Sequence, residues 1–328
     1  MIISTFLGFY RSRGIRLARQ IFPIPRLFPI SSFIERLVEK NVHTLSWYLL
    51  SLIGFSGSTF LRRDDIGNGV LCLNRNSPLG KRGEEISLPI DNVIYQWVLR
   101  RGRWEEQESN FLANYVNQYN GENIVFIDIG GQAGLVTRQF LSRLDRPISK
   151  AWIVEPFSAH ISAIQSNCYK WITNGVLEIF PYALDDIESQ RQLHIQNTNS
   201  GNASLLQFFQ NSDSSKSYIV EVKSVIEFEK LSSKANSSIV LKCDIQGMDS
   251  KVLSLFSKEF WGQVTCCVIE IWAIHAIEVL EVETLLKRWG HFVILSWDPA
   301  REKKCTLDEV RNFWLSKSGA TRNLYISA

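Results

Sequence analysis

The chain has 328 residues, of which 45% are hydrophobic and 21% are charged, and its formal net charge is +3. This length and apolar fraction suit one large globular α/β domain with an appendage, and so small a net charge does not demand a nucleic-acid partner. Six cysteines without C-x-x-C spacing favour small buried side chains over disulfides or zinc ligands. The first ten residues lack the charged start of a secretory signal, so a cytoplasmic protein is expected.

The first 90 residues are predicted to form an extension ahead of a core domain over 91–328. Five arginines lie in a stretch otherwise rich in Ile, Leu, Phe and Pro: Arg11, Arg13, Arg16, Arg19 and Arg26. A basic amphipathic segment such as 10–27 either contacts an anionic membrane surface or a partner protein, or packs on the body as a solvated helix. Residues 46–55 are apolar but shorter than the roughly 20 residues of a spanning helix, so a buried helix is predicted. The Gly-, Pro- and Asn-rich residues 67–89 indicate an irregular or hairpin lead-in.

From residue 92 the pattern becomes that of an α/β domain. Residues 92–119 have helical spacing, interrupted at Gly102. Apolar runs and helical patterns then alternate, which is typical of βαβ units in a parallel sheet with right-handed crossovers. The seven principal strands are predicted at 124–128, 151–155, 176–182, 239–244, 264–272, 292–297 and 323–327, with helices at 134–145, 157–171, 249–256 and 277–289. Two short strands, 192–196 and 218–222, flank a polar loop over 197–216, which either closes over a substrate or is a surface connection.

The most informative segment is 124–134, Ile-Val-Phe-Ile-Asp-Ile-Gly-Gly-Gln-Ala-Gly. Its apolar start is typical of a strand buried on both faces. Gly130, Gly131 and Gly134 then allow backbone to approach a ligand where a Cβ would collide. A helix is predicted to follow, which places a ligand at the carboxyl end of a parallel strand, where open α/β sheets bind small molecules.

The acidic residues at the strand ends indicate which ligand this is. The dinucleotide spacing G-x-G-x-x-G fails, because Ile129 stands where its first glycine belongs. Asp128 is expected to face the loop, where a carboxylate repels a pyrophosphate and attracts a ligand with an ammonium and a sulfonium group. S-adenosylmethionine fits that charge pattern. Glu155 ends the next apolar run and can accept hydrogen bonds from both ribose hydroxyls, although NAD would use the same acid.

A second cluster of charges follows the strand at 239–244. Lys242 and Asp244 are two residues apart and therefore point to the same face, so the lysine is expected to hold the aspartate ionised. Such a carboxylate can orient a substrate hydroxyl or accept its proton, or else form a salt bridge that caps the next helix. Glu270 ends a neighbouring strand at the same rim, with His275 shortly after it. Asp244, Asp249 and Glu270 offer oxygen ligands, but no local spacing demands a metal, and none is predicted.

Four sequence blocks stand in a characteristic order: 126–134, Ile-Val-Glu-Pro at 153–156, Pro-Tyr-Ala-Leu-Asp at 181–185, and Leu-Lys-Cys-Asp-Ile-Gln-Gly-Met-Asp at 241–249, which Val-Ile-Glu-Ile at 268–271 follows. In these blocks the chain resembles the FkbM family of S-adenosylmethionine-dependent methyltransferases, over roughly residues 92–300. The resemblance implies a Rossmann-like methyltransferase sheet with an antiparallel final strand. It also implies O-methylation of hydroxyls on sugars, glycolipids or polyketide-type molecules. Ala183 and Asp185 would flank the adenine, and residues 202–205 would lie near the site.

The chain departs from the family at four positions. Gly131 and Gln132 replace an alanine and an asparagine of the pattern D-x-G-A-N-x-G, and Gln132 keeps an amide on a longer side chain. Gln246 and Asp249 stand where the family has two glutamates after the K-x-D aspartate, and Gln246 removes a carboxylate from the rim. These departures bear on the geometry of the loop and on any base or metal ligand at position 246.

The sequence therefore predicts a class I methyltransferase fold of α/β type, with a seven-stranded mostly parallel sheet and helices on both faces. Asp128, the 130–134 loop and Glu155 would hold S-adenosylmethionine, while Asp244, with Lys242 and Glu270, would face a small-molecule acceptor. The alternatives are a non-catalytic binding or scaffold module, suggested by Gly131, Gln132 and Gln246, and an NAD-dependent oxidoreductase, which Ile129 and Asp128 disfavour.

Overall fold

The computed structural model describes residues 57–206, 215–233, 237–273, 284–285, 293–296, 306–316 and 320–327. The basic segment 10–27, the apolar segment 46–55 and His275 lie outside these residues. Residues Ser51–Ala328 form one compact unit. None of the helices in the described part is long and apolar enough to cross a membrane.

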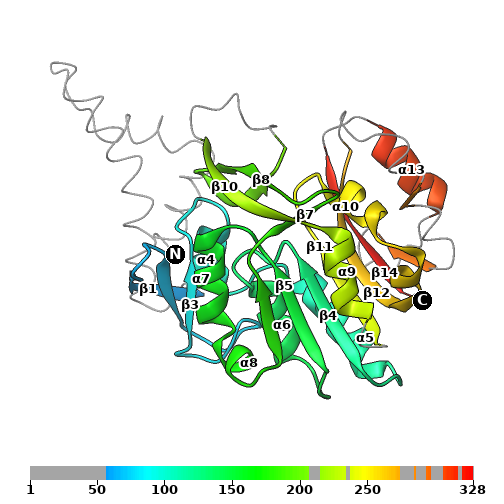
Figure 1. Ribbon diagram of the computed structural model, residues 1–328. Coiled ribbons are helices and arrows are strands. Elements are labelled where there is room, and N and C mark those ends of the chain that lie inside the picture. Colours follow the sequence, from blue (N-terminus) through cyan, green and yellow to red (C-terminus); the bar gives the residue numbers. More distant parts are fainter. Residues whose placement is uncertain are drawn as a thin grey trace, which may run out of the picture. The chain divides into compact units, whose positions relative to one another are not determined.

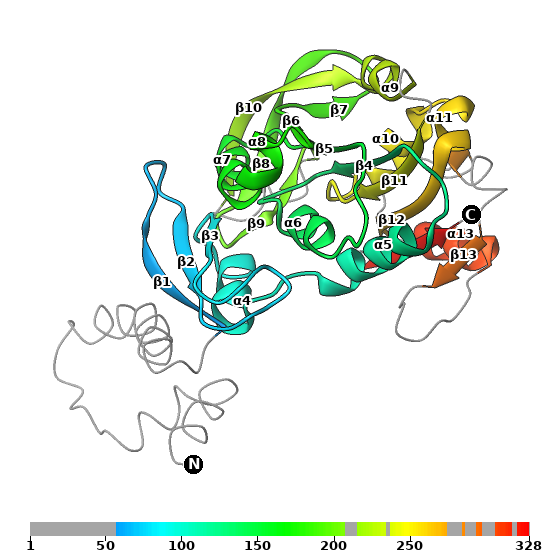
Figure 2. The same ribbon diagram turned by 90° about the horizontal axis from the view of Figure 1, so that it is seen from below.

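A seven-stranded sheet forms the centre of this unit (Figures 1 and 2). Its strands, in spatial order, are β13 (Val293–Ser296), β14 (Thr321–Ser327), β12 (Val264–Trp272), β11 (Ser238–Cys243), β4 (Ile124–Ile129), β5 (Lys150–Val154) and β6 (Leu177–Phe180). The neighbours from β12 to β6 pair in parallel, whereas β14 is antiparallel to both β12 and β13. This agrees with the expected seven strands and with the antiparallel last strand that the resemblance implied.

The central strand β4 shows why the sheet is covered on both faces. All six of its residues are buried, because alternate side chains enter two separate apolar layers. Val125, Ile127 and Ile129 pack in one layer, whereas Ile124 and Phe126 pack in the other. A strand apolar on both sides must be covered by helices on both sides, which makes this an α/β sandwich.

The helices divide between these two faces (Figure 2). On the Val125 face, buried side chains come from α9 (Val225–Ser233), α10 (Asp249–Leu255), α11 (Lys258–Gln263) and α13 (Leu307–Leu315). On the Phe126 face they come from α5 (Glu106–Gln118), α6 (Leu135–Ser142) and α7 (Ser158–Asn167). Two further helices are α4 (Ile94–Arg101) and α8 (Tyr169–Thr173). Gly102 ends α4 in the left-handed region at φ 65°, as the interruption of the helical pattern predicted.

A second, four-stranded sheet stands above the carboxyl end of the first (Figure 1). Its order is β7 (Ala183–Asp185), β10 (Ser215–Ser224), β8 (Ser189–Gln196) and β9 (Asn199–Ser204). The predicted polar loop over 197–216 is wrong in part, because 199–204 form β9 and residues 215–216 begin β10; residues 207–214 lie outside the described part. Pairing with β8 and an anchor at Ser200, whose hydroxyl and N–H donate to Asp91, stabilise a strand of low intrinsic propensity.

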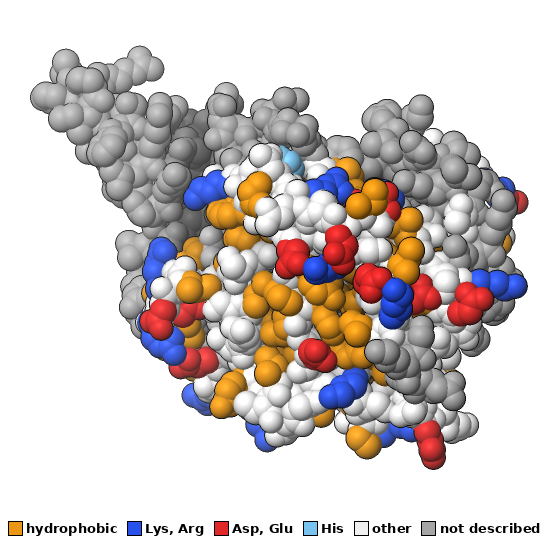
Figure 3. All heavy atoms as spheres, viewed as in Figure 1, with side chains coloured by type: hydrophobic (Ala, Val, Ile, Leu, Met, Phe, Trp, Pro, Cys, Tyr) orange, Lys and Arg blue, Asp and Glu red, His pale blue; other side chains and the backbone are white. Residues whose placement is uncertain are grey.

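Residues 57–90 belong to the same compact unit as the main sheet. They form an antiparallel sheet of β1 (Ser58–Arg63), β2 (Gly69–Leu73) and β3 (Glu85–Leu88). Asn167 of α7 exchanges hydrogen bonds with the backbone of Ser87 at 2.8 Å each, and Arg138 of α6 pairs with Glu84. The expected division near residue 90 therefore does not separate two compact units. On the face shown in Figure 3, acidic and basic side chains are interspersed around apolar ones, in keeping with the small net charge.

Candidate cofactor and acceptor site

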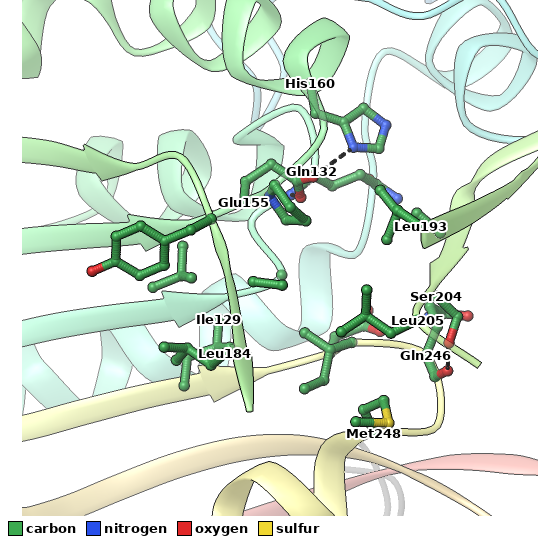
Figure 4. Close-up of a pocket in the computed structure, with 18 of the residues that line it drawn as sticks. Ile129, Gln132, Glu155, His160, Leu184, Leu193, Ser204, Leu205, Gln246 and Met248 are labelled. Atoms are coloured by element: carbon green, nitrogen blue, oxygen red, sulfur yellow. Dashed lines mark hydrogen bonds and ion pairs between the residues drawn. The ribbon is translucent and has the colours of Figure 1, made fainter. Parts of the chain in front are cut away.

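A pocket lies where β4, β5 and β11 end, beneath β8 and β9 (Figure 4). Its volume is about 610 Å³, which includes the open mouth. The pocket is lined by Ile129, Gly130, Gln132, Val154, Glu155, Pro156, His160, Tyr182, Ala183, Leu184, Leu193, Gly201, Ala203, Ser204, Leu205, Asp244, Ile245, Gln246 and Met248. This is the position at which open α/β sheets bind ligands.

The glycine loop packs closely against other protein atoms. A Cβ on Gly130, at φ 79°, would stand 1.9 Å from the carbonyl oxygen of Asp244. A Cβ on Gly131 would stand 2.2 Å from Ile153, and one on Gly134 would stand 3.2 Å from Cys168. Of these glycines only Gly130 lines the pocket. Gly130 and Gly131 therefore allow the end of β4 to approach β11 and β5, and Gly134 allows the loop to approach the end of α7. Gly130 is the glycine that also borders the cavity.

Asp128 is fully buried and does not line the pocket. Its Oδ2 accepts a hydrogen bond from the hydroxyl of Thr137 at 2.6 Å, and its Oδ1 lies 3.2 Å from Nζ of Lys242. The sequence predicted that the Asp128 carboxylate faces the ligand with its charge unpaired. In the structure the carboxylate lies outside the pocket lining, and the buried Lys242 neutralises its charge. Asp128 supports the loop from behind.

Lys242 pairs with Asp128 and not, as expected, with Asp244. The parallel register sets Lys242 directly beside Asp128, so the two side chains meet across the strands. Burial would lower the pKa of Lys242, but the charges of Asp128, Asp244 and Glu105 together raise it. The lysine therefore stays charged behind the pocket floor, where it also donates to the Gly130 carbonyl at 3.3 Å.

Glu155 faces the pocket as the sequence predicted. Its Oε2 accepts the N–H of Gln132 and its Oε1 accepts the N–H of Phe157, each at 2.9 Å. Nδ1 of the buried His160 lies 3.2 Å from Oε1 (Figure 4). A carboxylate has about four lone-pair sites, so Glu155 keeps accepting capacity for a ligand hydroxyl.

Ala183 and Asp185, which the resemblance placed beside the adenine, are separated by the structure. Ala183 lines the pocket. Asp185 is buried outside that lining, where it pairs with Arg191 and with Nζ of Lys251 at 2.6 Å. Three members of the 202–205 stretch, Ala203, Ser204 and Leu205, do line the pocket.

Asp244 lines the pocket, and Glu270 lies behind it. The side-chain amide of Gln246 donates to Asp244 Oδ1 at 2.6 Å and to Glu270 Oε2 at 2.9 Å. Trp272 donates its indole N–H to the same oxygen of Glu270 at 2.6 Å. Burial, followed by the charges of Asp244 and Asp249, raises the pKa of Glu270. Asp244 and Glu270 are therefore joined through Gln246, whereas Lys242, the third predicted catalytic residue, pairs with Asp128.

Asp249 accepts backbone hydrogen bonds from the loop that follows β11. Its Oδ1 accepts the N–H of Ile245 at 2.9 Å, and its Oδ2 accepts the N–H of Gly247 at 3.1 Å. Burial, and then the charge of Asp244, raises the pKa of Asp249 to about 7. This carboxylate is engaged by backbone donors, which is a structural role.

We expect the stability advantage of the natural protein over Asp249→Asn to shrink as pH rises from about 4 to about 7. A carboxyl whose pKa is raised in the folded state stabilises that state while protonated, and each pH unit in this window costs up to about 1.4 kcal/mol. Urea unfolding of both proteins across this window measures the change. The exposed Asp65→Asn serves as the control, and a difference that is constant with pH would contradict the assignment.

Two residues near the site have no strong local signal in the sequence. Glu105 precedes α5 in the left-handed region at φ 38°, and burial together with the charges of Asp244 and Glu108 raises its pKa to about 8. It reaches the carboxyl end of β11 through the tertiary fold. His160 lies in the first turn of α7, five residues after Glu155. The two side chains come close because the helix begins between them, and the sequence does not give that starting point.

No protein-family model matches the chain, and no curated protein matches its sequence. Among solved structures, methyltransferase FkbM from Methylobacillus flagellatus is similar at 12% identity and a TM-score of 0.38, over 71% of this chain and 52% of that one. An S-adenosylmethionine-dependent methyltransferase from Clostridium acetobutylicum has 12% identity and a TM-score of 0.36, over 71% and 96%. Spermidine synthase from Thermotoga maritima has 13% identity and a TM-score of 0.33, over 82% and 72%.

This chain spans about half the length of the Methylobacillus protein. Two of these proteins are named methyltransferases, and the Clostridium protein is named as S-adenosylmethionine-dependent, whereas the third is a spermidine synthase. At TM-scores below 0.5 these similarities do not by themselves establish a fold or an activity for the chain.

Proposed function

We propose that this protein is an S-adenosylmethionine-dependent methyltransferase that methylates a hydroxyl of a small molecule, with a sugar, a glycolipid or a polyketide-type compound as the acceptor class. The observation that carries the proposal is the charge of the pocket. Glu155 and Asp244 are its acidic lining residues, and none of the described lining residues is a lysine or an arginine. Such a lining favours a cationic ligand and disfavours a pyrophosphate.

The residues present fit this cofactor. Glu155 has accepting capacity for the ribose hydroxyls, and the apolar side chains of Ile129, Leu184 and Met248, which line the same pocket, offer contacts for a purine. Gly130 borders the end of the pocket nearest Asp244, and Gln132 lies beside Glu155. The main sheet also has the antiparallel last strand that the FkbM resemblance implied. Asp128 and Lys242 hold the loop in place from behind.

The chemistry then rests mainly on placement. When bound, the cofactor supplies a sulfonium with an already reactive methyl group. The protein's part is to hold the acceptor hydroxyl in line with that methyl, which is the larger contribution to rate. Asp244 is the residue that accepts the hydroxyl proton. β9, through Ala203 and Ser204, forms the wall against which the acceptor is positioned.

We expect Glu155→Gln to weaken S-adenosylmethionine binding about 10- to 100-fold, because a hydrogen bond to a charged group contributes about 1.5–3 kcal/mol. Isothermal calorimetry with S-adenosylmethionine and with NAD measures this. The control is Glu178→Gln, which changes an exposed glutamate on β6 and should bind as the natural protein does. Binding of NAD in preference would indicate an oxidoreductase, and binding of neither would indicate a non-catalytic module.

The acceptor can be identified by untargeted mass spectrometry of cells with and without the gene. A metabolite heavier by about 14 daltons, the mass of the CH₂ that one methyl transfer adds, would name the acceptor class. Its apolar part should match the lining of the pocket, as in other small-molecule sites.

A further inference from the structure

Gln246 connects three parts of the site. It lies after β11 in the left-handed region at φ 54°, and its side-chain amide donates to Asp244 at 2.6 Å and to Glu270 at 2.9 Å. Its carbonyl oxygen accepts the hydroxyl hydrogen bond of Ser204 at 2.8 Å (Figure 4). One residue therefore joins the pocket floor, the end of β12 and the strand β9 that covers the pocket.

Asp244 and Glu270, the two acidic side chains that this amide joins, are expected to carry one negative charge between them. The nearby cation, Lys242 on β11, is paired with Asp128 of β4. Among the described residues, the other ionisable groups that act on the pair are the acidic Glu105, which precedes α5, and Asp249 of α10. Glu108 of α5 acts on Glu105 and accepts hydrogen bonds from Asn323 and Tyr325 of β14. Because like charges this close disfavour double ionisation, the pair is expected to hold one proton.

The surroundings decide which carboxyl group keeps that proton. Asp244 lines the open pocket, whereas burial and the neighbouring Asp244 and Asp249 raise the pKa of Glu270. The amide hydrogens of Gln246 give each carboxylate a donor without supplying a titratable proton. A carboxylate at position 246, as in the FkbM pattern, would instead add a third acid to the pair.

We propose that Gln246 is a positioning residue that keeps Asp244 ionised and turned toward the pocket by leaving the proton of the pair on Glu270. This deepens the proposed function and rests on it. As the acceptor oxygen bonds to the methyl carbon, the acceptor hydroxyl gives its proton to Asp244. The electron pair of the broken carbon–sulfur bond stays on sulfur, which leaves a neutral thioether.

The test compares two ligands that differ in charge. S-adenosylmethionine carries a sulfonium and S-adenosylhomocysteine does not, so the ratio of their affinities reports the ionised Asp244. Calorimetry at several pH values from about 6 to about 9 gives this ratio for the natural protein, Gln246→Met and Gln246→Glu. The Gln107→Met variant, which changes an exposed glutamine of α5, is the matched control.

In Gln246→Met the two carboxyl groups should share their proton directly. The preference for the sulfonium should then fall about 3- to 10-fold near neutral pH and return as pH rises, since a nearby charge contributes on the order of 1 kcal/mol or more. Gln246→Glu has nearly the same shape, and its ratio should also become dependent on pH. The natural protein and Gln107→Met should keep a steady ratio.

A merely structural role would weaken both ligands equally and leave the ratio and its pH profile unchanged in both Gln246 variants, which would overturn the inference. If the natural protein binds neither ligand, the proposed function itself fails. These two failures are therefore distinguishable in one set of titrations.

Discussion

Lys242→Met is expected to lower the free energy of unfolding by about 3–5 kcal/mol, because removing one partner of a buried ion pair leaves an uncompensated charge. Lys242 and Asp128 are 4% and 0% exposed, and 3.2 Å separates Nζ from Oδ1. Without the lysine, Asp128 would retain the Thr137 hydroxyl as its hydrogen-bond donor. Urea unfolding followed by circular dichroism gives the difference in free energy.

Two further variants show whether the pair is the cause. Lys258→Met changes an exposed lysine at the start of α11 and should change stability by less than about 0.5 kcal/mol. The double variant with Asp128→Asn removes both charges and should recover part of the loss. A loss below about 1 kcal/mol in Lys242→Met is what a solvated surface pair would give and would contradict the assignment of a buried pair.

Gly130→Ala should abolish cofactor binding and destabilise the protein by more than about 3 kcal/mol. The new Cβ would stand 1.9 Å from the Asp244 carbonyl oxygen, which is backbone and cannot rotate away. The left-handed conformation at φ 79° adds about 1–2 kcal/mol. The ends of β4 and β11 would have to separate at the floor of the pocket. Calorimetry and thermal unfolding measure the two effects.

Gly175→Ala separates the clash from the conformational cost. Gly175 also has a positive φ, 70°, but a Cβ there would meet no atom within 4 Å. It should lose only the conformational contribution and bind the cofactor normally. Equal losses at both positions would mean that the approach of β4 to β11 is not what requires a glycine at 130.

The arrangement of the main sheet was predictable because its signals are local. The run 124–128 is apolar on both faces, and β4 is buried throughout; the predicted strand 323–327 corresponds to β14 at Thr321–Ser327. Glu155 was predictable in the same way, since the residue that follows the end of a parallel strand, here Val154 of β5, lies at the sheet's carboxyl edge. β9 was not, because Ser, Asn and Gly give little preference for a strand, and its pairing with β8 is a tertiary contact.

The partners of the charged side chains were decided only by the tertiary structure. The spacing of Lys242 and Asp244 correctly places both on one face of a strand, yet Lys242 pairs with Asp128, 114 residues away in sequence. The reason is that backbone geometry decides to which face of the sheet each side chain of a strand points. Which residue stands beside it on the next strand depends on the register of the two strands, here Lys242 opposite Asp128. The sequence by itself determined the strands of the main sheet, the glycine loop and the acids at the strand ends. Only folding decided that Asp128 is neutralised, that Gln246 joins Asp244 to Glu270, and that β9 covers the pocket, because each of these depends on which strands become neighbours.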